Sequence, residues 1–342
     1  MGNNKSKIVI IVGQTASGKS ALAIKLADKF NGEIISADSR QVYKGMDIGT
    51  GKVKKDRITN YVLSITGEEK TEYYSSGVRH HLIDIANPKK QFTVSDFKKL
   101  GEKAIEKILA AKKLPIIAGG TGLYIDALLG RMTIPELPPD KKLRAKLEKL
   151  TAGELFGQLL NLDPLRAKTI DRRNKRRLVR ALEIVLTTKK SSVFNPQFVI
   201  RNSQYDTLWL GIASEKNTLA KKIKKRLDGR LRQGMIKEVR GLLKNGVGHR
   251  RLQRFGLEYK WVSLYLKQFP ISNFQFPKKP SPKDFKDSDY YDNLLRDIIR
   301  YSKRQMTWFK RNKEIHWLAP SKVEGIKNEK EASRLTKSFI YS

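Results

Sequence analysis

A glycine-rich segment near the start of the chain has the residues and spacing of a phosphate-binding loop. Residues 13–20 read Gly-Gln-Thr-Ala-Ser-Gly-Lys-Ser and fit the pattern G-x-x-x-x-G-K-[ST]. In such a loop, backbone N–H groups and a helix start surround phosphate oxygens, the lysine bridges the phosphates, and the last hydroxyl can hold Mg²⁺. The expected phosphate-binding residues are Gly13, Gln14, Thr15, Ala16, Ser17, Gly18, Lys19 and Ser20, with Ser20 as the metal ligand.

The carboxylate of Asp38 is predicted to lie beside this loop. Asp38 follows an apolar strand at residues 33–36, and the carboxyl ends of parallel strands meet at one edge of a sheet. An ATPase would carry another acid after a later strand, but the strand at 114–118 ends in Gly119-Gly120-Thr121. Asp38 is therefore a candidate general base, and the alternative is an aspartate that caps a helix or turn.

The elements that position these residues alternate between strands and helices. Residues 7–12 form an apolar, β-branched run typical of a buried parallel strand, and residues 20–30 and 95–113 have helical spacing. With the strands at 33–36 and 114–118, this order predicts an α/β fold with a parallel sheet.

The pattern changes after residue 130. Prolines 135, 138 and 139 form a linker, and helices are predicted at 141–150, 154–162 and 176–186 with no strand between them. A strand at 207–213, a basic helix at 218–244, a loop at 268–288 and a helix at 290–310 follow. We expect a core at 1–130, a helical insertion domain at 131–204, a continued core at 205–320 and a tail at 321–342.

The charge predicts a polyanionic partner. The chain has 342 residues, 70 Lys and Arg against 34 Asp and Glu, and a net charge of +36. Residues 1–130 carry 21 basic and 13 acidic side chains, and residues 131–342 carry 49 and 21. Nucleic acid fits this surplus better than a membrane, because no basic amphipathic helix has a Trp/Phe/Leu face. A lysine-rich proteome is the alternative explanation.

The cysteine count narrows the chemistry further. With no cysteine, disulfides, thiol nucleophiles and cysteine-ligated metals are excluded, and four histidines argue against a His-rich metal site. The apolar run at 8–12 is too short for a signal peptide or a membrane span, so we expect a cytoplasmic protein.

Several segments together resemble the bacterial tRNA dimethylallyltransferases, also called isopentenyl-diphosphate:tRNA transferases. The resemblance covers about residues 5–318. It rests on the phosphate loop and on ISADSRQVY at 35–43, GMDIGT at 45–50, HHLID at 80–84, GGTGLY at 119–124, RRLVRALE at 176–183 and KRQMTWF at 303–309. It implies a P-loop NTPase-like core with a helical insertion. The eukaryotic members add a cysteine-dependent zinc finger, so the absence of cysteine favours the bacterial form.

The resemblance also implies a reaction and its partners. A dimethylallyl group passes from dimethylallyl diphosphate to N6 of the adenosine immediately 3′ of the anticodon, so the partners are the tRNA anticodon stem-loop, the diphosphate donor and Mg²⁺, with a monomer as the active form. Asp38, Lys19 and Arg226 become the catalytic residues, with Arg226 near the diphosphate. The residues expected to contact tRNA are Asp38, Ser39, Arg40, Gln41, Thr121, Arg144, Arg176, Arg177 and Arg180.

Some features leave alternatives open. His80, His81 and Asp84 invite a metal site, but adjacent residues on an extended chain point apart, which favours a structural role. The sequence departs from the family pattern at three places. Gln14 replaces the usual proline, segment 54–79 is longer than usual, and the residues at 256–259 differ from the common sequence. A P-loop kinase and a non-catalytic RNA-binding module remain the rival functions.

Overall fold

The structure is a computed structural model. It describes residues 5–56, 59–62, 69–132, 134–135, 137–138, 140–189, 191, 204–269, 281–318 and 326–342. The chain divides into two compact units, one made of residues 1–129 and 202–342 and the other of residues 130–201. From the sequence, we expected the helical insertion at 131–204.

The larger unit is built on a mostly parallel sheet, as expected for an α/β fold. The strand order is β3-β4-β5-β2-β6-β1-β7-β8, and the six strands from β5 to β8 in this order run parallel. β3 and β4 extend one edge as an antiparallel hairpin. The bounds are β1 Ser6–Gly13, β2 Gly32–Ala37, β3 Thr59–Val62, β4 Glu69–Ser75, β5 Val78–His81, β6 Leu114–Gly119, β7 Tyr205–Ile212 and β8 Ile315–Leu318.

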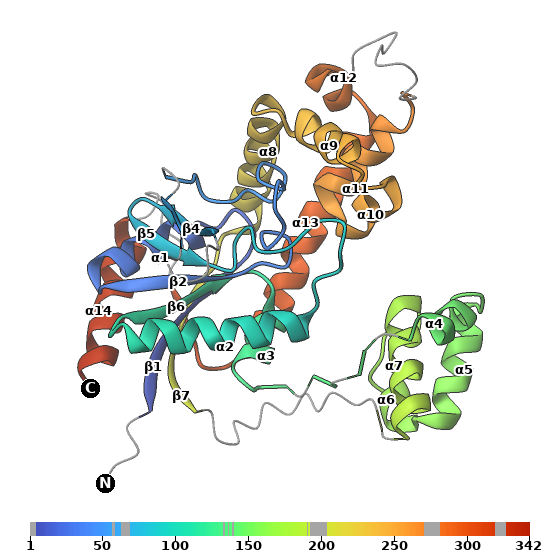
Figure 1. The fold of residues 1–342 in the computed structure, drawn as a ribbon, viewed down its shortest axis with the longest axis horizontal. Coiled ribbons are helices and arrows are strands. Elements are labelled where there is room, and N and C mark those ends of the chain that lie inside the picture. The colour runs from blue at the N-terminus through green and yellow to red at the C-terminus, as the bar shows by residue number, and fades with distance from the viewer. Residues whose placement is uncertain are drawn as a thin grey trace. The chain divides into compact units, whose positions relative to one another are not determined.

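Helices cover both faces of the sheet (Figure 1). α1 (Lys19–Lys29) and α14 (Ile326–Tyr341) pack on one face, and α2 (Val94–Ala110) and α3 (Gly122–Leu128) pack on the other. Alternate residues of β1 enter the two cores: Val9 and Ile11 face α1, whereas Ile8 and Ile10 face α2. This burial on both faces explains why the strands are continuously apolar.

The end of the chain differs from the tail expected at 321–342. Residues 326–341 form α14, which buries Ala332 in the core between the sheet and α1 and pairs Glu329 with Lys25. The prediction failed because this helix is stabilised by packing on distant elements and not by a strong local pattern.

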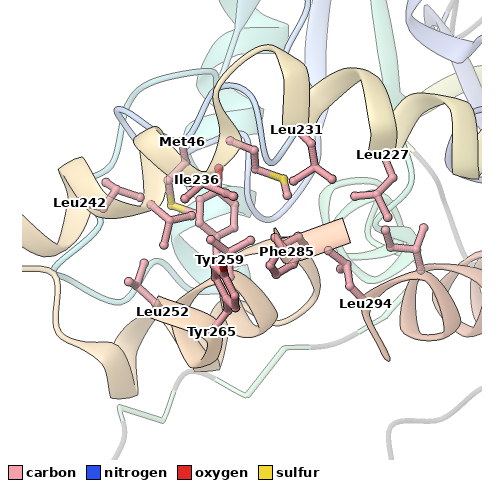
Figure 2. Close-up of a cluster of buried hydrophobic side chains, with 14 of the residues drawn as sticks. Met46, Leu227, Leu231, Ile236, Leu242, Leu252, Tyr259, Tyr265, Phe285 and Leu294 are labelled. Atoms are coloured by element: carbon pink, nitrogen blue, oxygen red, sulfur yellow. The ribbon is translucent and has the colours of Figure 1, made fainter. Parts of the chain in front are cut away.

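Six further helices of the described residues belong to the larger unit and share a third hydrophobic core. They are α8 (Lys216–Arg232), α9 (Met235–Lys244), α10 (His249–Phe255), α11 (Leu257–Leu266), α12 (Pro282–Lys286) and α13 (Asp289–Phe309). Figure 2 shows their apolar side chains around Tyr259, together with Met46 from the loop after β2. This core fixes α8 and α13, which carry site residues.

Two expectations in this region need correction. The basic helix expected at 218–244 is two helices, because Gly234 adopts a left-handed conformation with φ of 104° and starts α9. The loop expected at 268–288 contains α12, and residues 270–280 lie outside the described residues.

The smaller unit is helical, as the sequence indicated. It consists of α4 (Lys141–Leu147), α5 (Ala152–Leu162), α6 (Pro164–Ala167) and α7 (Lys175–Thr188), around its own core. α5 starts with a capping box between Thr151 and Glu154. Among all described helices, none has the length and apolar character to span a membrane.

Candidate active site at the phosphate loop

The phosphate loop joins β1 to α1 at the carboxyl edge of the sheet. Gly13 has a φ of 150°, and a Cβ there would lie 2.6 Å from the carbonyl oxygen of Ile212. Gly18 has a φ of 92° and directly precedes α1. Both positions favour glycine, because other residues rarely adopt these angles. The backbone N–H groups at the start of α1 are thus available to an anion.

Helix α13 holds the loop in place. The backbone N–H of Thr15 donates to Gln305 Oε1 at 2.8 Å, and Gln14 Nε2 donates to Ser302 Oγ at 2.9 Å. Gln305, which is buried, also donates to the carbonyl oxygen of Gly120 at 3.0 Å. α13 therefore connects the phosphate loop to the loop after β6.

The protonated form of Lys19 is destabilised by burial, and a bound anion would stabilise it. Its Nζ donates to the carbonyl oxygen of Gln14 at 2.5 Å within its own loop. Burial, followed by the like charge of Arg226, lowers the pKa of Lys19 to about 7, although Asp38 acts in the opposite direction. A diphosphate would replace the lost hydration and stabilise the protonated form.

The donor set at the loop fits a magnesium ion that shares its ligands with a phosphate group. The Ser20 hydroxyl is on the first turn of α1, lines the cavity at the loop, is exposed, and makes no hydrogen bond to the described residues. Within the described ranges, no group of three or more His, Cys, Asp or Glu could hold a metal by itself. Mg²⁺ commonly uses one or two protein oxygens together with substrate phosphates and water.

Asp38 lies in a turn and also faces the cavity. Its Oδ1 accepts hydrogen bonds from the backbone N–H groups of Arg40 at 2.9 Å and Gln41 at 3.3 Å. Its Oδ2 accepts none from the described residues, and Asp38 lines the cavity. Asp38 can therefore stabilise the turn and act as a base at the same time, because one oxygen holds the carboxylate in the turn and the other is available to substrate.

A cluster of arginines also lines the cavity. Arg226 and Arg230 project from α8, and Arg226 donates to the carbonyl oxygen of Gly51 at 3.2 Å. Loss of hydration and the neighbouring Arg230 lower the pKa of Arg226 to about 10. A Cβ on Gly51, where φ is 63°, would collide with both guanidinium groups, so the arginines pack directly on the backbone.

One buried carboxylate, that of Glu258, binds two of the arginines. Glu258 is 2% exposed, and its Oε2 accepts from Arg40 at 3.0 Å while its Oε1 accepts from Arg230. The pKa of Arg40 is raised, since Glu258 and Asp38 together outweigh its burial. Glu258 thus balances part of the positive charge beside Asp38.

The other residues expected to contact RNA beside Asp38 are held by internal hydrogen bonds. The backbone N–H of Ser39 donates to Thr121 Oγ1 at 3.1 Å. Gln41 Oε1 accepts from Ser36 Oγ at 3.0 Å, and Gln41 Nε2 points to the carbonyl oxygen of Gly51 at 3.4 Å. These contacts fix the backbone around Asp38.

The cavity brings the three predicted catalytic residues together in about 780 Å³ of empty space, which includes its open mouth. Of the predicted residues, its lining contains Thr15, Lys19, Ser20, Asp38, Arg40, Gln41 and Arg226. Ser39 and Thr121 are not part of the lining.

In the smaller unit, the predicted arginines fall into two groups. Arg144 and Arg180 both bind the fully buried Glu183, with Arg144 Nε at 2.8 Å from Oε1 and Arg180 NH1 at 2.5 Å from Oε2. Arg176 and Arg177 are exposed on the first turn of α7. Only the exposed pair has side chains that are not committed to this buried carboxylate.

The histidine pair and Asp84 have structural partners. His80 Nδ1 contacts the carbonyl oxygen of Val78 at 3.0 Å, and His81 Nε2 lies 2.6 Å from Glu33 Oε2. Asp84 pairs with Lys52, whose side chain is 2% exposed. These contacts agree with the structural role expected from the sequence.

Comparison with known proteins decides the family. The profile of the family described as IPP transferase matches residues 41–312, and that of isopentenyl transferase matches residues 6–62. A tRNA dimethylallyltransferase of Alkaliphilus oremlandii is 36% identical over 329 residues, covering 95% of each chain. One from Staphylococcus aureus is 39% identical over 326 residues, covering 93% of this chain and 94% of its own. This chain belongs to the IPP transferase family.

Solved structures agree with this assignment. The tRNA isopentenylpyrophosphate transferase of Bacillus halodurans superposes with a TM-score of 0.65 at 31% identity, covering 98% of this chain and 97% of its own. A eukaryotic dimethylallyltransferase, solved acting on tRNA, shares the fold with a TM-score of 0.73 at 23% identity, covering 98% and 80%. The P-loop NTPase-like fold class expected from the sequence is confirmed.

Three residues that hold other parts of the site in position in this member of the family were not identified from the sequence. Glu258 lies in the first turn of α11, within the segment 256–259 whose sequence departs from the family pattern. Glu238 accepts from the backbone N–H groups of residues 47–49 at 2.6–3.0 Å and so fixes the MDIGT loop. Gln305 belongs to the recognised segment KRQMTWF. Its role was not predicted, because its partners lie about 185 and 290 residues away in the chain. No local signal marks such contacts.

Proposed function

We propose that this protein transfers a dimethylallyl group from dimethylallyl diphosphate to N6 of the adenosine immediately 3′ of the anticodon in tRNA, releasing diphosphate. One observation carries the proposal: in a member of the IPP transferase family, a phosphate loop, a carboxylate with one uncommitted oxygen and an arginine cluster line the same cavity. This combination suits a reaction with a diphosphate leaving group and a proton to remove.

The phosphate loop, Lys19 and Arg226 would bind the diphosphate. As the allylic C–O bond breaks, negative charge grows on the leaving oxygen, and fixed N–H groups and cations stabilise that charge. Mg²⁺, held through Ser20 and the diphosphate oxygens, would neutralise part of the same charge when bound. Lys19 gains most from the diphosphate, because its charge is poorly solvated without an anion.

Asp38 would act as the base. The exocyclic amine of adenine is a weak nucleophile, because its lone pair is delocalised into the ring, so proton removal must accompany attack. As the N–C bond forms and the C–O bond breaks, the proton passes to Asp38 Oδ2 and the electron pair leaves with the diphosphate. The adenine must leave its stack to reach this carboxylate, as in other enzymes that modify a base.

We also propose which part of the tRNA is bound, the oligomeric state of the active form and the cell compartment. The anticodon stem-loop is the expected RNA element, and the exposed Arg176 and Arg177 are expected to meet its phosphates. The active form is proposed to be a monomer, since all residues assigned to the chemistry come from one chain. The cytoplasm is the proposed compartment, because the substrate is tRNA.

The test is incubation with labelled dimethylallyl diphosphate, Mg²⁺ and unmodified tRNA. We expect label at the adenosine 3′ of the anticodon and one diphosphate released per label. A tRNA with guanosine at this position is the matched control and should remain unlabelled. ATP hydrolysis or phosphorylation without labelled RNA would instead support the kinase alternative, and RNA binding without either product would support a binding module.

A further inference from the structure

The cavity has an apolar lining as well as a charged one. Ala23 from α1, Ile34 from β2 and Ala118 from β6 line it and belong to the buried core between the sheet and α1. Val53 and Ile83, from two loops, add to this apolar lining. If the diphosphate lies on the phosphate loop, the hydrocarbon part of a donor has this surface to bury against.

A row of side chains connects this lining to the β3–β4 hairpin. Ile34 pairs directly with His80 on β5, and His80 pairs directly with Tyr73 on β4. Directly paired residues share one face of a sheet, so the three side chains lie side by side. The rings of Tyr73 and His80 meet edge to face, with centroids 6.1 Å apart. Burial lowers the pKa of His80, so the imidazole is neutral at pH 7.

Tyr73 reaches the cavity wall. Its hydroxyl donates to the carbonyl oxygen of Val53 at 2.6 Å, and its ring is 6% exposed. Burial raises the pKa of Tyr73, so the hydroxyl remains protonated and keeps donating. Lys55 Nζ lies over the ring, 5.0 Å from its centroid.

The segment after Val53 is hydrogen-bonded to β4 and to the turn that follows β4. The backbone N–H of Asp56 donates to the carbonyl oxygen of Tyr74 at 2.8 Å, and Asp56 Oδ2 accepts from the backbone N–H of Gly77 at 2.8 Å. These bonds hold Asp56 beside β4, and the Tyr73 hydroxyl holds the backbone of Val53, which is half-buried.

We propose that β4, acting through Tyr73 and Val53, closes the apolar side of the cavity and limits the donor to a five-carbon prenyl chain. This inference rests on the proposed function, because it assigns the hydrocarbon part of the same donor. Prenyl chains lengthen by five carbons at a time, and a fixed wall discriminates strongly against such an extension. Even one methylene in a closed apolar pocket changes selectivity by roughly 10–200-fold.

The test is calorimetric binding of inorganic diphosphate, dimethylallyl diphosphate and geranyl diphosphate, the ten-carbon homologue. We compare the unaltered protein with Val53→Ala, which shortens the wall, and Tyr73→Phe, which removes only the hydroxyl that holds it. Tyr74→Phe is the matched control, because the Tyr74 hydroxyl donates to Glu72 at 2.9 Å and not to the cavity wall. Thermal unfolding checks that each variant is folded.

We expect the unaltered protein to prefer the five-carbon donor by at least about tenfold. Val53→Ala should reduce this preference by about tenfold and Tyr73→Phe by several-fold, while Tyr74→Phe leaves it unchanged and inorganic diphosphate binds equally to all four proteins. An unchanged preference in folded Val53→Ala and Tyr73→Phe would overturn the inference. Because these are binding measurements, loss of the proposed function would show separately, as unlabelled tRNA despite selective donor binding.

Discussion

At the scale of single residues, the position of Asp38 explains how one carboxylate can be both structural and reactive. Oδ1 is occupied by two backbone N–H groups of its own turn, while Oδ2 accepts no hydrogen bond from the described residues and Asp38 lines the cavity. The turn therefore places the reactive oxygen without using any other acid. This is consistent with the absence of a carboxylate directly after β6, where Gly120 and Thr121 follow instead.

Asp38→Asn is expected to separate binding from chemistry. Asparagine keeps an acceptor for the N–H groups of Arg40 and Gln41 but cannot remove a proton, so kcat should fall by about 10²–10⁴-fold. The dissociation constants for tRNA and donor should stay within about threefold, since one turn acceptor is retained. Single-turnover kinetics measure the first quantity and filter binding the second. Asp28→Asn, at an exposed position of α1, is the control, and near-normal turnover by Asp38→Asn would remove Asp38 from the base role.

Lys19 gives the donor site a dependence on pH. Its pKa is about 7 without an anion, and a bound diphosphate raises that pKa, because negative charge favours the protonated ammonium. Binding therefore takes up a proton above pH 7. Affinity is highest at or below pH 7 and falls as pH rises toward 9, by up to about tenfold per unit.

Calorimetry of inorganic diphosphate binding at pH 8, in buffers with different ionisation heats, measures this proton uptake. We expect close to one proton in the unaltered protein and none assignable to this site in Lys19→Gln. Lys25→Gln is the control, because Lys25 pairs with Glu329 at the surface. Proton uptake that persists in Lys19→Gln would assign the titration to another group.

At the scale of elements, α13 is the part that connects the two glycine-rich loops. Gln305 accepts from the phosphate loop and donates to Gly120, and Trp308 Nε1 donates to Asp126 on α3 at 2.9 Å. A Cβ on Gly120 would collide with Gln305, and one on Gly122 would collide with Trp308. The glycines of GGTGLY are therefore explained by the close approach of α13.

Gln305→Leu should loosen the phosphate loop. The substitution leaves the half-buried Thr15 N–H and Gly120 carbonyl without their partner, which costs about 0.5–1.5 kcal/mol of unfolding free energy. We expect the KM for the donor to rise by about tenfold, while the KM for tRNA changes little. Urea unfolding and steady-state kinetics measure the two effects. Thr307→Ala, at an exposed position on the same helix, should change neither, and an unaltered donor KM in Gln305→Leu would contradict this role.

The elements also show which parts of the fold the sequence could predict. The strand, loop and helix at 6–29 were predictable, because apolar runs and glycine spacing are local signals. The turn that positions Glu258 was not, since it depends on positive φ angles at Gly256 and Leu257 and on distant arginines. The β3–β4 hairpin was also missed, because its stability comes from pairing with β5 at a sheet edge.

At the scale of the whole molecule, the positive charge is divided between different tasks. Lys19, Arg226 and Arg230 surround the cavity of the larger unit, and Glu258 balances part of their charge. The smaller unit, at 130–201, has 17 basic and 7 acidic residues in only 72 positions. This surplus of positive charge cannot be neutralised by the unit's own acidic residues. One of these acids, the buried Glu183, is already paired with Arg144 and Arg180.

This division predicts that the arginines of α7 act differently on tRNA binding. Arg176→Ala combined with Arg177→Ala removes two exposed charges, so the slope of log affinity against log salt should become shallower by about 1–2. Stability should stay within about 0.5 kcal/mol, because surface substitutions rarely cost more. Measuring the tRNA affinity at salt concentrations from about 50 to 300 mM gives this slope.

Arg180→Ala provides the contrast on the same helix. It leaves the buried Glu183 with Arg144 as its remaining arginine partner among the described residues, so the main effect should be a loss of about 1–3 kcal/mol in unfolding free energy. Its salt slope should change by less than that of the double variant, because the Arg180 guanidinium already pairs with a carboxylate. If both variants flatten the slope equally and neither lowers stability, the separation of α7 into an RNA-facing pair and a structural arginine is wrong, and all three arginines bind phosphate.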